Sequence, residues 1–278
     1  MEKEMLGTII STCDLPPKQI SKIVGQYDER IGLSHAFWNL VEGDPKLGAE
    51  VVRELQFTLK LGELTMYHMA LLRELQHQRH EGVIRGSKDL LDQDWISLIK
   101  KRVEGQIIGI PPDVPGETEE EKTNNYVEAL RVGIPNLFPA AMIARRLETL
   151  RQDDAAGIVA AAPTESVEGQ DRPSGEESNA SLERLSKFFE QNPTFDLFTT
   201  PIEKTLDEKT CEDLKRQRRL SKITPVDSSA SLDLHVDGFT SAHDVARMGR
   251  ANFLARYGSR LGLEAKSIHA SAVQQSLM

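Results

Sequence analysis

The segment LQFTLKLGELTMYHMALLRELQ, Leu55 to Gln76, decides the class of fold. Its apolar residues recur at the spacing of helical faces. One face is formed by Phe57, Leu61, Leu64, Leu71 and Leu75. A neighbouring face is formed by Leu55, Leu59, Met66, Met69 and Leu72. A helix that is apolar over so much of its circumference is predicted to be a central packing helix with other helices around it.

Capping signals predict where this helical region starts and where it bends. Asp44 can act as an N-cap and Pro45 can occupy the first helical position, so a helix is expected to begin near residue 45. Gly62 lies inside the apolar pattern, and an interior glycine costs about 1 kcal/mol relative to alanine without forbidding a helix. We therefore expect either one long helix or two helices with a kink at Gly62.

Similar signals continue along the chain. Asp92 is expected to cap the next helix, and Thr118 with Glu121 has the pattern of a capping box at the start of another. The prolines that follow the isoleucines in residues 107–116 predict an extended loop, because proline has no N–H and fixes φ. A further helix is expected after Pro135.

The composition changes over residues 151–180. This stretch holds seven acidic residues, two prolines and three glycines with almost no large apolar side chains, so it is expected to be flexible. The predicted organisation is an N-terminal helical region over residues 1–150, an acidic linker or insertion loop over 151–180, and a C-terminal helical region over 181–278 that packs with the first. The predicted fold class is all-α, an irregular multi-helix bundle with long loops of helical-shell type.

The overall composition excludes several classes of protein. The formal charge of -9, from 43 acidic and 34 basic residues in 278, disfavours a surface built throughout for phosphate backbones. Cys13 and Cys211 are far apart and belong to no CxxC pair, so neither a disulfide framework nor a zinc site is indicated. No run of about eighteen apolar residues predicts a transmembrane helix, and the acidic amino terminus does not resemble a signal peptide.

Catalytic motifs are scarce. The sequence has no GxSxG, GxxxxGK[ST], HExxH or GxGxxG pattern. His68 could act with Glu63 or Glu74, but a histidine on an apolar helix is more often a core or interface group. No catalytic or cofactor-binding residue is therefore predicted, and no cofactor.

Two histidines could in principle hold a metal ion. His77 and His80 are three residues apart, but the nearest third ligand, Glu81, points elsewhere on a helix. Solvated side chains at a polar helix end are the commoner outcome, so no metal site is predicted.

The only concentrated basic segment is KRQRRLSK, Lys215–Lys222. It could bind nucleic acid or an acidic partner, but no aromatic residues are interleaved with it, and a surface helix with Leu214 and Leu220 facing inward is favoured. Trp38 and Trp95 could line a ligand pocket, although large aromatic residues among aliphatic neighbours are usually core anchors.

Six blocks of sequence, in order and covering most of residues 30–262, resemble the A components of bacterial Tc insecticidal toxin complexes and the related A protein of Salmonella virulence plasmids. The first three blocks are FWNLVEGDPKLGAEVVRELQFTLKLGELTMYHMALLRELQ, LLDQDWISLI and IPPDVPGETEEEKTNNYVEAL. The others are FFEQNPTFDLFTTPIEKTL, DLKRQRRLSKI and FTSAHDVARMGRANFLARYG. Each block is a packing pattern, and none is a catalytic signature.

The resemblance implies a segment of the helical shell that surrounds the channel of a pentameric, pore-forming and toxin-translocating subunit. It implies a secreted or cell-surface location, with other regions or protomers of an A component and the toxin B and C components as partners. No nucleic-acid partner and no direct membrane insertion by this segment are expected. The label "neuraminidase-like", often given to such proteins, does not imply activity here, because no SxDxGxTW-type box is present.

The chain departs from the family in length, and it carries no channel helices, receptor-binding β-domains or apolar pore tip. It is therefore expected to be a piece of an A component or a short relative. Two other functions stay open at this point. One is a stand-alone α-helical interaction protein that holds a partner through residues 151–180 or the KRQRR helix. The other is a hydrolase with acidic catalytic residues.

Overall fold

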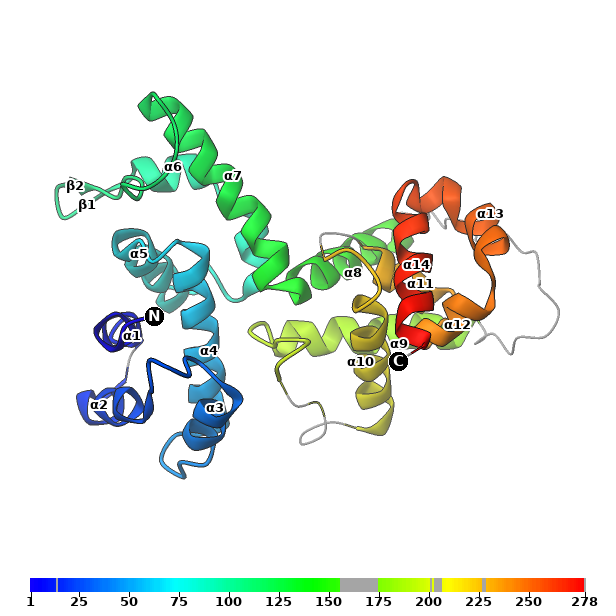
Figure 1. Ribbon diagram of the computed structural model, residues 1–278, viewed down its shortest axis with the longest axis horizontal. Coiled ribbons are helices and arrows are strands. Elements are labelled where there is room, and N and C mark those ends of the chain that lie inside the picture. The colour runs from blue at the N-terminus through cyan, green and yellow to red at the C-terminus, as the bar shows by residue number, and fades with distance from the viewer. Residues whose placement is uncertain (14, 156–174, 201, 203–206, 227–228, 278) are drawn as a thin grey trace. The chain divides into compact units, whose positions relative to one another are not determined.

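The structure is a computed structural model that describes residues 1–13, 15–155, 175–200, 202, 207–226 and 229–277. Within these residues the regular structure is helical except for two short strands, β1 (Arg102–Val103) and β2 (Gln106–Ile107). The prediction of an all-α fold is confirmed. The chain divides into two compact units, an N-terminal unit, Met1–Leu137, and a C-terminal unit, Phe138–Met278 (Figure 1).

The N-terminal unit is built around one helix. In chain order its helices are α1 (Lys3–Ile10), α2 (Pro17–Gln26), α3 (His35–Glu42), α4 (Ala49–Leu64), α5 (Met69–His80), the 3-10 helix η1 (Ser87–Asp92), α6 (Trp95–Lys100) and α7 (Glu119–Leu137). Helix α4 packs against α1, α3, α5 and α7. Val52, Phe57 and Thr58 of α4, which lie on different faces, are each almost completely buried. The prediction of a central packing helix is confirmed for α4.

The quoted segment is interrupted at residues 65–68, so both predicted alternatives, one long helix and a kink at Gly62, are wrong. Gly62 lies inside α4, and the break comes where Met66 and Tyr67 adopt left-handed φ angles of 54° and 58°. The N–H of Tyr67 donates to the carbonyl of Gly62 over 2.7 Å and closes the end of the helix. Met66, expected on the second apolar face, is 46% exposed, and Met69 is only half-buried.

Two of the predicted caps are displaced. Helix α4 begins at Ala49 and not near residue 45, because Asp44 accepts the N–H of Lys46 (3.1 Å) within a turn. The cap of α6 is Asp94 and not Asp92. Asp94 accepts the N–H of Ser97 over 3.1 Å.

The capping box before α7 is present as predicted. The N–H of Glu121 donates to the Thr118 hydroxyl (3.1 Å), and the N–H of Thr118 donates to the Glu121 carboxylate (3.3 Å). The helix continues through Pro135 and ends at Leu137, and the next helix begins at Pro139, as expected for a helix after Pro135. Of the extended loop predicted for residues 107–116, Ile107 is the last residue of β2, and residues 108–116 follow it outside any helix.

The C-terminal unit contains two apolar clusters. Its helices are α8 (Pro139–Ala155), α9 (Gly175–Gln191), α10 (Glu208–Ser221), α11 (Ala230–Val236), α12 (Ala242–Arg247), α13 (Arg250–Leu261) and α14 (Glu264–Ser276). Helix α9 packs against α8, α10 and α11, and its Phe188 and Phe189 belong to the first cluster. Helices α12 and α13 pack against α14, and Phe253 and Tyr257 belong to the second.

The division between the units differs from the predicted organisation. It falls at Leu137/Phe138, so α8 belongs to the C-terminal unit although most of it lies within the predicted N-terminal region, residues 1–150. Both ends of the stretch 151–180, predicted to be a flexible linker, are helical, because α8 runs to Ala155 and α9 starts at Gly175. The middle of that stretch, 156–174, lies outside the described residues.

Candidate functional site

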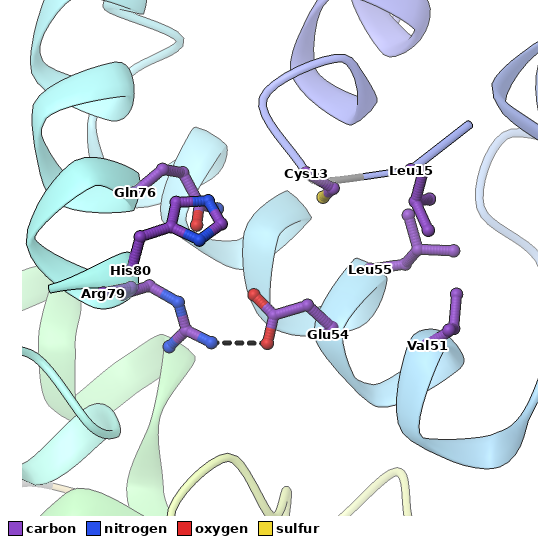
Figure 2. A pocket seen from close by; sticks show the side chains of 8 residues that line it. All are labelled: Cys13, Leu15, Val51, Glu54, Leu55, Gln76, Arg79 and His80. Atoms are coloured by element: carbon purple, nitrogen blue, oxygen red, sulfur yellow. Dashed lines mark hydrogen bonds and ion pairs between the residues drawn. The ribbon is translucent and has the colours of Figure 1, made fainter. Parts of the chain in front are cut away.

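A pocket of about 420 Å³ opens in the N-terminal unit among α4, α5 and the segment after α1 (Figure 2). Ligand pockets in proteins commonly measure about 300–1,000 Å³. Its apolar wall is formed by Cys13, Leu15, Val51 and Leu55, and its polar wall by Glu54, Gln76, Arg79 and His80. The lining residues of α4 and those of α5 share one spacing, i, i+3, i+4, so each helix presents a single face.

Arg79 and Glu54 form an ion pair across the pocket floor, from Arg79 Nη2 to Glu54 Oε2. The guanidinium group also lies 4.1 Å from the centroid of the Phe57 ring, where the positive charge is attracted to the π face. Only 10% of the Arg79 side chain is exposed, against 38% for Glu54. The pair is therefore buried on its arginine side and partly exposed on its carboxylate side.

Cys13 is not arranged as a nucleophile. Burial raises the pKa of its thiol to about 11, a smaller effect from the Thr58 hydrogen bond lowers it, and still smaller effects come from Glu54 and Arg79. The thiol donates to Thr58 Oγ1 over 3.2 Å, and Gln76 Nε2 donates to the same oxygen over 2.7 Å. Since the thiolate is the nucleophile, a thiol with this pKa is almost entirely unreactive near neutral pH.

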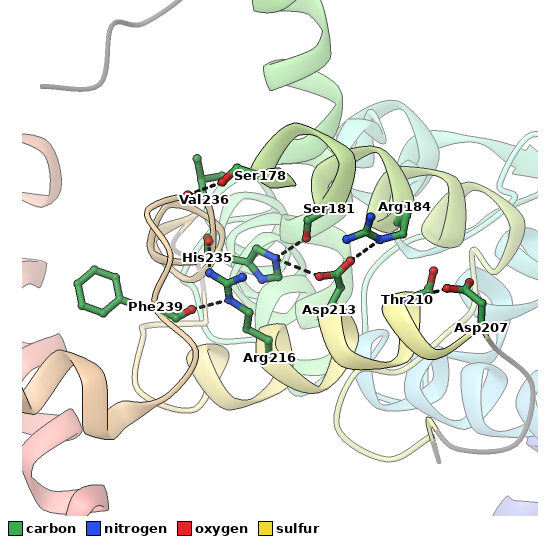
Figure 3. Close-up of polar contacts among 10 residues, drawn as sticks. All are labelled: Ser178, Ser181, Arg184, Asp207, Thr210, Asp213, Arg216, His235, Val236 and Phe239. Atoms are coloured by element: carbon green, nitrogen blue, oxygen red, sulfur yellow. Dashed lines mark hydrogen bonds and ion pairs between the residues drawn. The ribbon is translucent and has the colours of Figure 1, made fainter. Parts of the chain in front are cut away.

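The C-terminal unit contains a buried polar network that links α9, α10 and α11 (Figure 3). Ser181 Oγ lies 2.8 Å from His235 Nε2, and Asp213 Oδ1 lies 3.9 Å from the same nitrogen. Arg184 Nε donates to Asp213 Oδ2 over 2.7 Å. His235 is 1% exposed and Ser181 is 3% exposed.

A serine, a histidine and an aspartate close together suggest a catalytic triad, but the geometry excludes that role. In a triad the serine and the carboxylate bind opposite ring nitrogens, so that one orients the imidazole while the other receives the proton. Here Ser181 and Asp213 both face Nε2, and Nδ1 is buried without a partner among the described residues. Burial, followed by the nearby Arg216 and Arg184, lowers the pKa of His235 to about 3, which leaves it a poor base. The network is structural.

The basic run Lys215–Lys222 covers the last turns of α10 and its C-cap residue, and two of its arginines are held in internal contacts. Arg216 donates to the carbonyls of Phe239 and His235, in each case over 2.6 Å (Figure 3). Arg218 donates to the carbonyl of Thr200 over 2.5 Å. Leu214 and Leu220 are fully buried, as expected for the surface-helix interpretation. Arg216 and Arg218 tie α10 to backbone carbonyls of the segments around it.

His68 does not meet either of its proposed partners. It is the N-cap residue of α5, and its ring packs edge-on to Tyr126 with 6.3 Å between centroids. Burial lowers the pKa of His68. Glu74 instead binds Lys101 Nζ (2.7 Å), and no contact joins His68 to Glu63 among the described residues.

The two histidines at the end of α5 point to different surroundings. His77 pairs with Glu81 (Nε2 to Oε1, 3.3 Å), whereas His80 lies at the rim of the pocket. The described part of the chain holds no group of three histidine, cysteine or acidic side chains that could bind a metal ion.

The two tryptophans differ in burial. Trp95 is 1% exposed and belongs to the core, as its aliphatic neighbours indicate. Trp38 is half-buried and contacts Phe37 edge-on, with 5.1 Å between ring centroids. Neither lines the pocket of Figure 2.

The polar network and the pocket are the features that sequence reasoning missed. Ser181, Asp213 and His235 are separated by up to 54 residues, and nothing in their local sequence predicts their meeting. The sequence carried one weak signal of the pocket: its lining residues on α4 and those on α5 recur at the same spacing, i, i+3, i+4.

Among the described residues no single helix is both long enough and apolar enough to cross a membrane. Consecutive helices α7 and α8 reach the necessary length and composition only when taken together across the bend between them. Comparison with known proteins adds no assignment: no protein-family model, no curated protein and no solved structure matches this chain.

Proposed function

We propose that the chain is a non-enzymatic helical module, a segment of the shell of a Tc-type toxin A component. The proposal rests on the resemblance of six sequence blocks and on how those blocks are used in the fold. Apolar residues from different blocks, among them Leu61, Tyr126 and Phe253, are completely buried. Blocks that supply core positions in this way are what a scaffold requires, since burying each such side chain contributes about 1.5–3 kcal/mol.

The contacts made by the potentially reactive side chains support the same proposal. His235 and Asp213 are enclosed in the network between helices, Arg216 and Arg218 bind backbone carbonyls, and the Cys13 thiol has a raised pKa. In the described residues these groups stabilise helix contacts. On this proposal the protein is secreted or surface-located, and its partners are other regions or protomers of an A component and the toxin B and C components.

The stand-alone interaction protein has less support. Its basic docking segment would need the α10 arginines, and Arg216 and Arg218 are engaged internally. Its other docking segment lies mostly in residues 156–174, outside the described part of the chain. A hydrolase with acidic catalytic residues would need paired acids in a pocket, and among the described residues that line the pocket of Figure 2 the one acid is Glu54.

The test is complementation of an A component. The chain is purified and its mass and helicity are measured by light scattering and far-UV circular dichroism. It is then mixed with a Tc A component from which the resembling region has been deleted, and co-elution on size exclusion is measured. We expect a helical chain that joins the deleted component in fixed stoichiometry.

Leu61→Asp is the control, because a charge at this fully buried position unfolds the N-terminal unit and abolishes co-elution. A wild-type chain that is folded yet never associates with the deleted component contradicts the proposal. Hydrolytic turnover that is lost in Glu54→Gln would replace it with an enzymatic function.

A further inference from the structure

The pocket between α4 and α5 presents a carboxylate oxygen that has no partner. Glu54 uses Oε2 to bind Arg79, and its other oxygen, Oε1, accepts no hydrogen bond from the described residues. Figure 2 shows this carboxylate at the centre of the pocket, between the side chains of α5 and the apolar wall. A group that enters the pocket therefore meets a free anionic acceptor.

Two further acceptors line the same side. Gln76 donates its amide N–H to Thr58 over 2.7 Å, which leaves the side-chain carbonyl oxygen to accept. His80, at the exposed rim, can accept through a ring nitrogen when the imidazole is neutral. With Glu54 Oε1 these make three acceptors, which is the number of donors on a primary ammonium group.

The positive charge of Arg79 does not make the pocket an anion site. Its Nη2 is already bound to Glu54, and Nε and Nη1 are closed to solvent although they have no partner among the described residues. An entering anion therefore cannot reach a free N–H of the guanidinium group. The Glu54 side chain is 38% exposed against 10% for Arg79, so the carboxylate is the more accessible charged group of the pair.

The opposite wall suits a hydrocarbon stem. Leu15, Val51 and Leu55 line it, together with Cys13. Amphipathic cations such as lysine lay their methylene groups along apolar surface while the charged end reaches polar partners. The combination of an aliphatic wall with a cluster of acceptors matches that shape.

We propose that this pocket binds a primary ammonium group on an unbranched aliphatic stem, supplied either by a lysine side chain of another polypeptide or by a free alkylamine. Glu54 forms the ion pair, Gln76 and His80 take the remaining ammonium hydrogens, and Arg79 holds Glu54 in position. This proposal does not rest on the function proposed above, and either one can fail alone.

The test is a titration of the full chain at pH 8 with n-pentylamine, followed by NMR chemical shifts or calorimetry. The matched controls for charge are n-pentanol and pentanoate, which have the same number of carbon atoms. We expect saturable binding of pentylamine at one site, weaker binding of pentanol and none of pentanoate. Glu54→Gln keeps an oxygen for Arg79 but removes the charge, and it should weaken pentylamine binding at least about tenfold.

Glu63→Gln, an exposed acid on the same helix outside the pocket, should bind as the wild type does. Val51→Phe fills the pocket without changing charge and should also abolish binding, which keeps the test decisive if Glu54→Gln is unstable. Any one of three results overturns the proposal. These are no saturable binding of pentylamine, equal binding of pentanoate and pentylamine, or equal affinity of the Glu54 and Glu63 variants for pentylamine.

A blocked lysine, Nα-acetyl-lysine methylamide, identifies the source of the ammonium group. Binding at least as tight as that of pentylamine supports a lysine side chain of another polypeptide. Binding of pentylamine with rejection of the blocked lysine supports a free alkylamine.

Discussion

At the scale of single residues, the buried polar groups of the C-terminal unit determine how it responds to pH. His235 is enclosed by Ser181, Asp213 and Arg216, and it stays neutral because burial penalises the imidazolium ion. A buried hydrogen-bonded group of this kind adds little net stability, but removing one partner costs about 1–3 kcal/mol. The network therefore helps to specify which faces of α9, α10 and α11 pack against one another.

The pH dependence of unfolding should reflect His235. Its pKa is about 3 in the folded chain and 6.5 as an ordinary histidine, so between these values the unfolded state binds a proton that the folded state does not. Stability must then fall as the pH is lowered from 6.5 towards 3, by up to about 1.4 kcal/mol per pH unit from this group.

Urea unfolding between pH 7.5 and 5 measures this slope. His68 and His269, whose pKa values burial also lowers, act in the same direction. The comparison with His235→Gln isolates the His235 contribution: the variant should show a shallower slope, and equal slopes would contradict the assignment.

At the scale of secondary-structure elements, the break between α4 and α5 organises the N-terminal unit. Met66 and Tyr67 take left-handed backbone conformations, which for L-residues other than glycine cost roughly 1–2 kcal/mol each. Tertiary contacts hold the turn: Tyr126 Oη donates to the carbonyl of Thr65 over 2.8 Å. Helix α7 thus fixes the end of α4.

Met66→Gly should stabilise the protein by about 1 kcal/mol, because glycine adopts a positive φ without strain and the Met66 side chain is largely exposed. Met66→Ala is the control and should bring no gain, since alanine retains the strain. Urea unfolding at pH 7.5 measures both. A glycine variant no more stable than the alanine variant would show that the turn is unstrained.

Two glycines inside helices offer a matched comparison. A Cβ on Gly62 would meet Ile9 and Tyr67 at 3.5–3.6 Å, which is ordinary contact, so Gly62→Ala should stabilise α4 by up to about 1 kcal/mol. A Cβ on Gly133 would lie 2.8 Å from Leu64 Cδ1, and Leu64 is buried. Gly133→Ala should therefore destabilise the protein by about 1–3 kcal/mol. Thermal and urea unfolding give both values, and a stabilising Gly133→Ala would refute the packing of α7 on α4.

At the scale of the whole molecule, the chain is two units with separate cores. The N-terminal core surrounds α4, and the C-terminal core consists of the clusters around Phe188 and Phe253. Each unit has about 140 residues, a size at which a single domain buries roughly two thirds of its surface. Each is therefore large enough to fold alone.

Fragments 1–137 and 138–278 should each be helical and unfold cooperatively. Circular dichroism with urea unfolding measures this. Fragment 1–67 is the control and should not fold, because it deprives α4 of α5 and α7. If 1–137 is as unstructured as 1–67, the division at Leu137/Phe138 is not a folding boundary.

The sequence by itself determined the helical class, the burial of α4 and the capping box before α7, because periodicity and capping are local properties that a few neighbouring residues decide. It allowed one long helix or a bend at Gly62, since glycine is the intrinsically weak helix residue, whereas the break lies at Met66 and Tyr67, where Tyr126 of α7 binds the Thr65 carbonyl. Only the tertiary structure brought His235 to Ser181 and Asp213, and Glu54 to Arg79. These contacts depend on how helices that are distant in sequence pack together, and no local sequence pattern encodes them.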